Sequence, residues 1–218
     1  TQAKTLFPYT TLFRSTNPSC NIMRFYFLHR IKMDIDTKRH HTQAMLDQAE
    51  LLFSETECRA ALERLAGEIC ADLGGKYPLL LPVMGGAVVF TGQLLPLLRF
   101  PLDFDYVHVS RYGDKLEGGN FNWLRMPEPQ NIAGRHVVVL DDILDEGHTM
   151  SAIKEKLLEM GAASCATAVF ANKLTGKPKP IQADYVGIDV PNRYVFGYGM
   201  DAAGAWRNLG AVYALGPA

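Results

Sequence analysis

The stretch VVVLDDILDEGHTM, residues 137–150, decides the fold of this 218-residue chain. Its first four residues are all apolar, which predicts a strand that is buried on both faces, as in a parallel sheet. Two adjacent acids, Asp141 and Asp142, come directly after that strand, and a polar loop then leads into a helix expected over residues 148–160. Ligands of open α/β sheets bind where strands end and helices begin. The stretch therefore predicts an α/β fold with a ligand site at the carboxyl edge of a central sheet.

The loop after this strand has the composition of a phosphate cradle. Backbone N–H groups at the start of a helix favour an anion, Gly147 lets the backbone approach closely, and Thr149 adds a hydroxyl donor. Asp141 and Asp142 could hold sugar hydroxyls or Mg²⁺, which prefers carboxylate oxygens and water. The acids could instead cap the helix. However, Asp145 is a third acid within five residues, and the three repel one another unless a cation or polyhydroxy ligand lies between them, so we favour a binding site.

The elements around this stretch extend the alternation of strands and helices. Ser54 and Glu57 have the spacing of a capping box, which predicts the start of a helix that Gly74 and Gly75 end. Apolar residues within that helix recur at steps of three and four, so one face is expected to be buried. Further strands are expected over residues 79–83, 104–110, 164–171 and 185–190, and a further helix over residues 87–98.

Residues 111–134 carry little apolar periodicity, and loops of this length in a compact domain are usually functional. Gly118 and Gly119 lie between residues 115–117 and 120–123, so the loop is expected to fold as an exposed hairpin. We interpret the hairpin as a lid over the site, in preference to an inert excursion.

Composition excludes several classes of protein. A formal net charge of −1 and 48% apolar residues fit one soluble α/β domain, without the excess of Lys and Arg that a dedicated nucleic-acid binder needs. The longest apolar run, residues 78–91, is too short and interrupted to span a bilayer, and no secretory signal is recognisable. The cysteines have no spacing typical of a zinc site, so we expect reduced thiols in a cytoplasmic protein. They are Cys20, Cys58, Cys70 and Cys165.

Residues 1–32 show no periodicity that leads into a neighbouring element. Within them TLFPYTTLFRS, residues 5–15, resembles the conceptual translation of a common sequencing adapter. We therefore expect a non-native or disordered leader over residues 1–32, a natural start at Met33 or Met45, and one domain over residues 33–218. A genuine flexible arm is the alternative.

Two stretches carry a resemblance to a known family. Residues 137–150 resemble the phosphoribosyl-pyrophosphate-binding motif of type I phosphoribosyltransferases, in which four apolar residues precede two acids, two apolar residues and an acid-x-Gly-x-Thr loop. The run DYVGIDVPNRYVFGYGMDAAGAWRNL, residues 184–209, is similar to the base-binding region of hypoxanthine-guanine phosphoribosyltransferases, and the likeness extends from about Leu51 onward. The resemblance implies a mostly parallel central sheet flanked by helices, with a small hood formed by N- and C-terminal segments.

The same resemblance implies a purine salvage enzyme that converts hypoxanthine or guanine and phosphoribosyl pyrophosphate to IMP or GMP and pyrophosphate. Mg²⁺ is the implied cofactor, neither nucleic acid nor a membrane is an expected partner, and the implied assembly is a homodimer or homotetramer. A preference for xanthine stays open, because one polar contact to the second ring substituent decides it. The alternative from another class is a phosphoribosyl-pyrophosphate-sensing regulator that binds nucleic acid, but the sequence has no basic stripe and no added helix-turn-helix.

The residues of the base site follow from this resemblance by position. Asp145 matches the acid that accepts a proton from the purine, and Lys173 matches the lysine that donates to the 6-oxo group. Tyr194 matches the aromatic residue that stacks on the base, and Val195 offers backbone contacts to the base edge. Asp201, assigned with the base-binding residues, matches the acid near the second metal.

The phosphate and metal side is assigned in the same way. Asp141 and Asp142 match the acidic pair that holds the ribose hydroxyls, directly or through Mg²⁺, and with Asp201 they are the expected metal ligands. The residues expected to bind phosphoribosyl pyrophosphate are Asp141, Asp142, Glu146, Gly147, His148, Thr149, Gly85, Gly86 and Arg207.

Two positions depart from the family pattern. The family often has lysine beside the first glycine of the pyrophosphate loop and a Ser-Tyr pair at the start of the mobile loop, whereas this chain has Met84 and the lid residues Arg111 and Tyr112. Contacts of Met84 with pyrophosphate are therefore expected through its backbone only. A cis peptide bond at Val83–Met84 is a family expectation that the sequence does not test.

Overall fold

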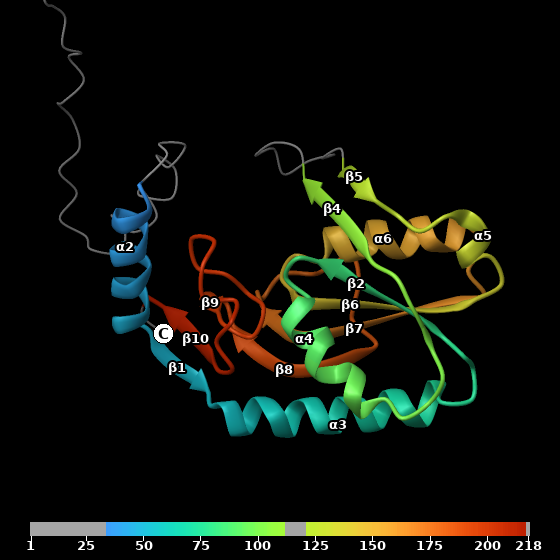
Figure 1. The fold of residues 1–218 in the computed structure, drawn as a ribbon, viewed down its shortest axis with the longest axis horizontal. Coiled ribbons are helices and arrows are strands. Elements are labelled where there is room, and N and C mark those ends of the chain that lie inside the picture. The colour runs from blue at the N-terminus through green and yellow to red at the C-terminus, as the bar shows by residue number, and fades with distance from the viewer. Residues whose placement is uncertain (1–33, 112–120, 217–218) are drawn as a thin grey trace, which may run out of the picture. The chain divides into compact units, whose positions relative to one another are not determined.

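The computed structural model describes residues 34–111 and 121–216 of the chain. Strands and helices alternate over most of this length, as the sequence patterns predict (Figure 1). The helices are α2 Ile35–Asp47, α3 Glu55–Leu73, α4 Val88–Leu94, the 3₁₀ helix η1 Leu95–Leu97, α5 Pro129–Ile132 and α6 His148–Glu159. The strands are β1 Glu50–Phe53, β2 Leu79–Met84, β3 Asp103–Phe104, β4 Val107–Arg111, β5 Phe121–Arg125, β6 His136–Leu144, β7 Ser164–Leu174, β8 Tyr185–Pro191, β9 Tyr194–Phe196 and β10 Val212–Leu215.

A seven-stranded sheet forms the centre of the domain, in the order β5-β4-β2-β6-β7-β8, with β3 also paired to β2. All of these pairs are parallel except β4 with β5. Strand β2 shows why the sheet is buried on both faces. Leu80 belongs to the apolar cluster that includes residues of α3 and α4, whereas Leu79 and Leu81 belong to the cluster that includes residues of α6. The predicted class, a mostly parallel sheet flanked by helices, is confirmed.

A second, three-stranded sheet joins β1 to β10 and β9, with antiparallel pairing throughout. This sheet is the hood, and its construction from early and late segments of the chain is as expected. The sequence pattern predicts no helix over the residues of α2, yet this helix forms. Thr42 and Met45 are its only buried residues among 13, and such a narrow apolar face leaves little periodicity to recognise.

Strand β6 extends further than predicted. It continues through both acids to Leu144, where it pairs with Asn172 of β7. The expected strand end at Leu140 is therefore wrong. Polar side chains do not interrupt the backbone ladder, and the parallel partner β7 also continues beyond its predicted end at Ala171.

Strands β4 and β5 pair antiparallel on either side of residues 112–120. Residues 112–120, which include Tyr112 and the first arm of the predicted hairpin, lie outside the described residues. Arg111 is the last residue of β4.

Three of the four cysteines lie within the described residues. Cys58, Cys70 and Cys165 are free, and burial raises the pKa of both Cys58 and Cys165 to about 11. Cys20 lies outside the described residues. In the part of the chain that the structure describes, no helix is long and apolar enough to cross a membrane.

Candidate active site

Asp141 and Asp142 lie next to each other in the carboxyl half of β6. The Asp142 backbone N–H donates to Asp141 Oδ1 at 3.0 Å. The Asp142 carboxylate lies against Gly86 so closely that a Cβ at Gly86 would overlap it. Burial raises the pKa of both carboxyls, and the neighbouring charge of Asp142 raises the pKa of Asp141 further. Such a pair favours a cation beside it.

Arg207 reaches the same place from the C-terminal segment. Its Nη1 lies 3.6 Å from Asp142 Oδ2 and donates to the carbonyl oxygen of Gly199 at 2.6 Å, while its Nη2 donates to Asp201 Oδ1 at 2.5 Å. The Arg207 side chain is 41% exposed, so it is open to an anion from solvent. A Cβ at Gly199 would overlap the carbonyl oxygen of Gly86. The structure therefore brings Gly86, Asp142 and Arg207 together, as the resemblance implies.

The turn before Gly86 differs from one family expectation. The cis peptide bond is Met84–Gly85, and the expected position at Val83–Met84 is wrong by one bond. Met84 is the last residue of β2, and Gly85 is exposed.

The loop that follows β6 opens helix α6 as predicted. Gly147 occupies the position before the helix with a φ of +84°, a left-handed conformation that glycine adopts without strain. Glu146 and His148 are exposed, and Thr149 is half-buried in the first turn. An anion-binding role for this turn stays a prediction.

Asp145 and Lys173 leave the ends of neighbouring strands side by side, because the residues before them, Leu144 and Asn172, are direct partners in the register of β6 and β7. Lys173 Nζ lies 2.6 Å from Asp145 Oδ2. The lysine side chain is only 13% exposed, whereas the aspartate is 49% exposed. The two groups assigned to base recognition and proton transfer are thus in direct contact.

Tyr194 and Val195 belong to β9 of the hood. The Tyr194 side chain is exposed, and its hydroxyl donates to the carbonyl oxygen of Asp201 at 3.1 Å. Val195 is buried, so any contact it makes with a ligand would come from its backbone. These positions fit a stacking ring followed by a residue that offers backbone groups.

The Asp201 carboxylate is held by its own neighbours, since Oδ1 accepts from Arg207 and Oδ2 accepts from the Gly204 N–H at 2.7 Å. Within residues 34–111 and 121–216, no three acidic, histidine or cysteine side chains are grouped as a metal site. Mg²⁺ usually binds one or two protein carboxylates together with substrate phosphates and water. Metal binding by Asp141, Asp142 and Asp201 stays a prediction, and of the three Asp201 has both carboxylate oxygens engaged by Arg207 and Gly204.

Comparisons with known proteins agree with this geometry. Residues 50–203 match the family model of the phosphoribosyl transferase domain. The hypoxanthine-guanine phosphoribosyltransferase of Streptococcus pneumoniae R6 is 32% identical over 164 residues, which cover 75% of this chain and 91% of that protein. The chain belongs to the hypoxanthine-guanine phosphoribosyltransferase family.

Other relatives of this phosphoribosyltransferase support the same assignment. The hypoxanthine-guanine phosphoribosyltransferase of Bacillus subtilis 168 is 30% identical over 172 residues, covering 79% of this chain and 96% of that protein. A solved hypoxanthine phosphoribosyltransferase from Staphylococcus aureus has a TM-score of 0.73 at 26% identity, and covers 80% of this chain and 95% of its own. A solved hypoxanthine-guanine-xanthine phosphoribosyltransferase has a TM-score of 0.65 at 31% identity, with coverages of 78% and 96%. The type I phosphoribosyltransferase fold is thus confirmed.

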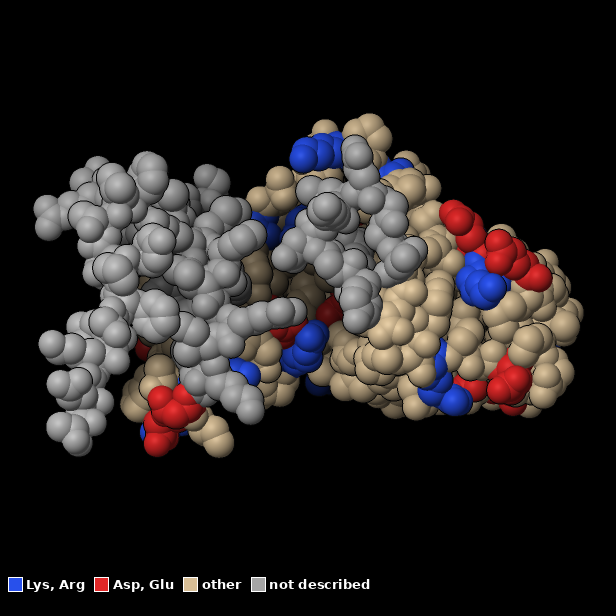
Figure 2. All heavy atoms as spheres, turned by 90° about the horizontal axis from the view of Figure 1, so that it is seen from above, with Lys and Arg blue, Asp and Glu red and all other residues tan. Residues whose placement is uncertain are grey.

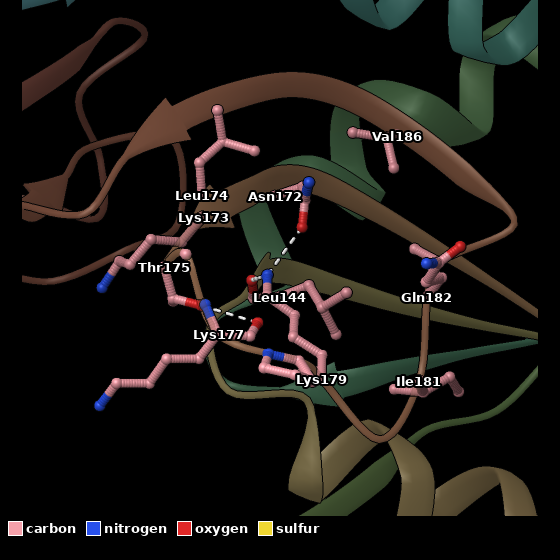
Figure 3. Close-up of a pocket in the computed structure, with 13 residues that line it drawn as sticks. Leu144, Asn172, Lys173, Leu174, Thr175, Lys177, Lys179, Ile181, Gln182 and Val186 are labelled. Carbon is pink, nitrogen blue, oxygen red and sulfur yellow. Dashed lines mark hydrogen bonds between the residues drawn. The ribbon is translucent and has the colours of Figure 1, made fainter.

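Some residues that contact the site of this phosphoribosyltransferase were not predicted from the sequence. A cavity of about 490 Å³ lies beside the ends of β6 and β7. Figure 3 shows the side chains of Asn172 and Lys179, two of its lining residues, pointing toward each other. Lys179 lies between Pro178 and Pro180, and these two prolines are its only local signal in the sequence. Gly199 was missed because its close approach to Gly86 joins segments far apart in the chain.

Proposed function

We propose that this chain transfers the 5-phosphoribosyl group of phosphoribosyl pyrophosphate to hypoxanthine or guanine, which yields IMP or GMP and pyrophosphate. The observation that carries the proposal is the contact of Asp145 with Lys173 at the end of the strand that holds Asp141 and Asp142. A proton acceptor, a donor to an oxygen and an acidic pair are the groups that this reaction needs, and they occur together in a member of this family.

The reaction breaks the bond between the anomeric carbon and the pyrophosphate oxygen, and the bonding electrons leave with the pyrophosphate. Arg207 carries a half-exposed positive charge near Gly86, where it would stabilise the negative charge that develops on the leaving group. Asp141 and Asp142 would hold Mg²⁺, which when bound supplies positive charge to the diphosphate. Their buried position and mutual repulsion fit that role.

The new bond forms between the anomeric carbon and a ring nitrogen of the purine, which then loses its proton. Asp145 would accept this proton, a positioned step that is worth roughly 10² to 10⁴ in rate. Lys173 would exchange Asp145 for the 6-oxo group as its hydrogen-bond acceptor when the base enters. Tyr194 would stack on the ring, and the backbone of Val195 would contact its edge.

Pyrophosphate release tests the proposal when guanine, hypoxanthine, xanthine, adenine and uracil are offered separately with phosphoribosyl pyrophosphate. We expect release with hypoxanthine and guanine, and loss of that release in excess chelator because the acid pair then lacks its cation. Release with uracil or adenine alone would reject the proposed acceptor, and release that resists chelator would reject the cation.

Use of xanthine is a second candidate activity, favoured by the similarity to the solved hypoxanthine-guanine-xanthine phosphoribosyltransferase. A regulator that binds nucleic acid gains no support, because acidic and basic side chains of the described residues are interspersed on the face that Figure 2 shows. We also propose, from the family resemblance, a cytoplasmic location and an assembly into a homodimer or homotetramer. Light scattering of the purified chain would test the assembly.

A further inference from the structure

Lys179 ties the ends of β6 and β7 together. Its Nζ donates to the carbonyl oxygen of Leu144 and to Oδ1 of Asn172, both at 2.7 Å (Figure 3). Leu144 and Asn172 are partners in the β6–β7 register. Each is followed directly by a residue of the proposed base site, Asp145 after Leu144 and Lys173 after Asn172. The Lys179 ammonium group therefore joins β6 and β7 at the residues that directly precede the Asp145–Lys173 ion pair.

The third strand end belongs to the same network. Asn172 Nδ2 donates to Asp189 Oδ1 at 2.7 Å, and these two residues are partners in the β7–β8 register. The Asn172 amide thus has its oxygen on Lys179 and its nitrogen on Asp189. This arrangement fixes the orientation of Asn172 and with it the acceptor that Lys179 uses.

The loop that carries Lys179 is restricted on both sides. Pro178 and Pro180 fix their own φ angles, and each proline also limits the residue before it to extended conformations. The next residue, Ile181, packs on the loop before α6, since a Cβ at Gly147 would lie 3.2 Å from Ile181 Cγ2 and 3.5 Å from Pro180 Cδ. The segment 179–181 therefore contacts the chain both before and after residues 145–146.

The surroundings of Lys179 argue against a role in simple charge pairing. The side chain is half-buried, its two acceptors are neutral oxygens, and the described residues give it no ion pair. Burial lowers the pKa of Lys179 although the charges of Asp145 and Asp189 act to raise it, so desolvation opposes the ammonium charge. A partly buried charge of this kind is weak evidence that Lys179 stabilises the fold. The two hydrogen bonds of Lys179, however, fix the ends of β6 and β7 relative to each other.

We propose that Lys179 is a positioning residue that sets the separation of Asp145 from Lys173 and thereby shapes the site for the purine base. The inference rests on the proposed function, since it assumes that both of these groups contact the base. A misplacement of about 1 Å at a reacting group can cost about 10²-fold in rate. Lys179 would act through Leu144 and Asn172, without touching the substrate.

The experiment compares Lys179→Met and Lys179→Arg with a control, Lys177→Met, in the full chain. Lys177 is an exposed lysine two residues earlier on the same loop. We expect Lys179→Met to lower kcat/KM for hypoxanthine by about tenfold or more, through both kcat and the KM of the base. The KM of phosphoribosyl pyrophosphate and the Tm should stay near their wild-type values. Lys179→Arg should recover part of the loss because it keeps the donors, and Lys177→Met should match wild type.

A double-mutant cycle with Asn172→Ala tests the route of the effect. If Lys179 acts through Asn172, the double variant should lose clearly less activity than the product of the two single losses, because both changes break the shared Lys179–Asn172 contact. Losses that multiply would overturn the inference. So would a Lys179→Met variant that matches wild type, fails to fold, or raises the KM of phosphoribosyl pyrophosphate as much as that of the base. A wild-type chain that is inactive with every oxopurine would reject the proposed function itself.

Discussion

Asp145 and Lys173 contact each other at 2.6 Å, so under the proposed function each would change partner when a purine binds. The carboxylate gives the largely buried ammonium group an acceptor that the 6-oxo group would then replace. The ion pair also keeps the Asp145 carboxylate half-exposed at the strand end, where a ring nitrogen can reach it. Substitution of Asp145 should therefore affect mainly proton transfer, and substitution of Lys173 should affect mainly recognition of the base.

Replacement of Asp145 by Asn should lower kcat by about 10² or more at neutral pH, because the amide cannot accept the purine proton. Folding and the binding of phosphoribosyl pyrophosphate should be preserved, since the side chain keeps its shape. The control is Glu159→Gln, at the end of α6, which removes an exposed carboxylate remote in the chain from the site. Single-turnover rates at saturating substrate measure the effect, and an unchanged rate would remove Asp145 from this role.

Replacement of Lys173 by Met should sharply lower kcat/KM for hypoxanthine and guanine and narrow the gap to adenine. The ammonium group donates to a 6-oxo acceptor but meets only an amino donor in adenine. Affinity for phosphoribosyl pyrophosphate should stay nearly intact. Oxopurine rates that do not change in this variant would show that the base pocket has been assigned to the wrong residue.

Single functional residues can be predicted from the sequence when their neighbours in the chain carry the signal. The acids 141 and 142 stand out because three acids follow one apolar run, and Lys173 stands out through its family context. Lys179 does not, because its acceptors are a backbone carbonyl 35 residues away and an amide that faces another strand. Contacts of this kind leave no periodic pattern in the chain.

The turn between β2 and α4 requires a glycine at position 86, because a side chain there would overlap the Asp142 carboxylate. Gly86 to Ala should lower the free energy of unfolding by about 1–3 kcal/mol, since the added Cβ overlaps the Asp142 carboxylate and one of them must move. Turnover should fall as well because the acid pair shifts. The control is Gly92→Ala within α4, where a Cβ has open space and helix propensity improves. Denaturant unfolding measures both, and equal stability of the two variants would contradict the close packing.

The sequence predicts elements in proportion to the strength of their local signals. Helix α3 has a capping box and a repeated apolar face, and both its ends agree with prediction. Strands β9 and β10 have only three and four residues, too few for alternation to be recognised. The polar end of β6 was missed because its ladder depends on pairing with β7, which the local pattern does not report.

Chains that start at different residues test where the folded domain begins. We propose that residues 1–32 are dispensable and that residues 33–218 form the domain. A chain that starts at Met33 should keep its Tm and activity, because it retains Asp34, whose side chain accepts from the Thr37 N–H at the start of α2. A chain that starts at Met45 should lose several degrees of Tm, since Trp206 Nε1 then loses the Thr42 carbonyl oxygen to which it donates at 2.6 Å. A comparable loss in the Met33 chain would show that the leader stabilises the domain.

One competition experiment tests the central claim, which is that the molecule is a 6-oxopurine phosphoribosyltransferase. Hypoxanthine, guanine and adenine are offered together, at equal concentration, with Mg²⁺ and limiting phosphoribosyl pyrophosphate, and the nucleotides formed are identified and counted against pyrophosphate. The product ratio reports the ratio of kcat/KM values. We expect one pyrophosphate for each IMP or GMP, with AMP lower by a factor of about 10⁴, as for sites built around a specific polar contact. AMP in amounts comparable to IMP, or pyrophosphate without a purine nucleotide, would contradict the account.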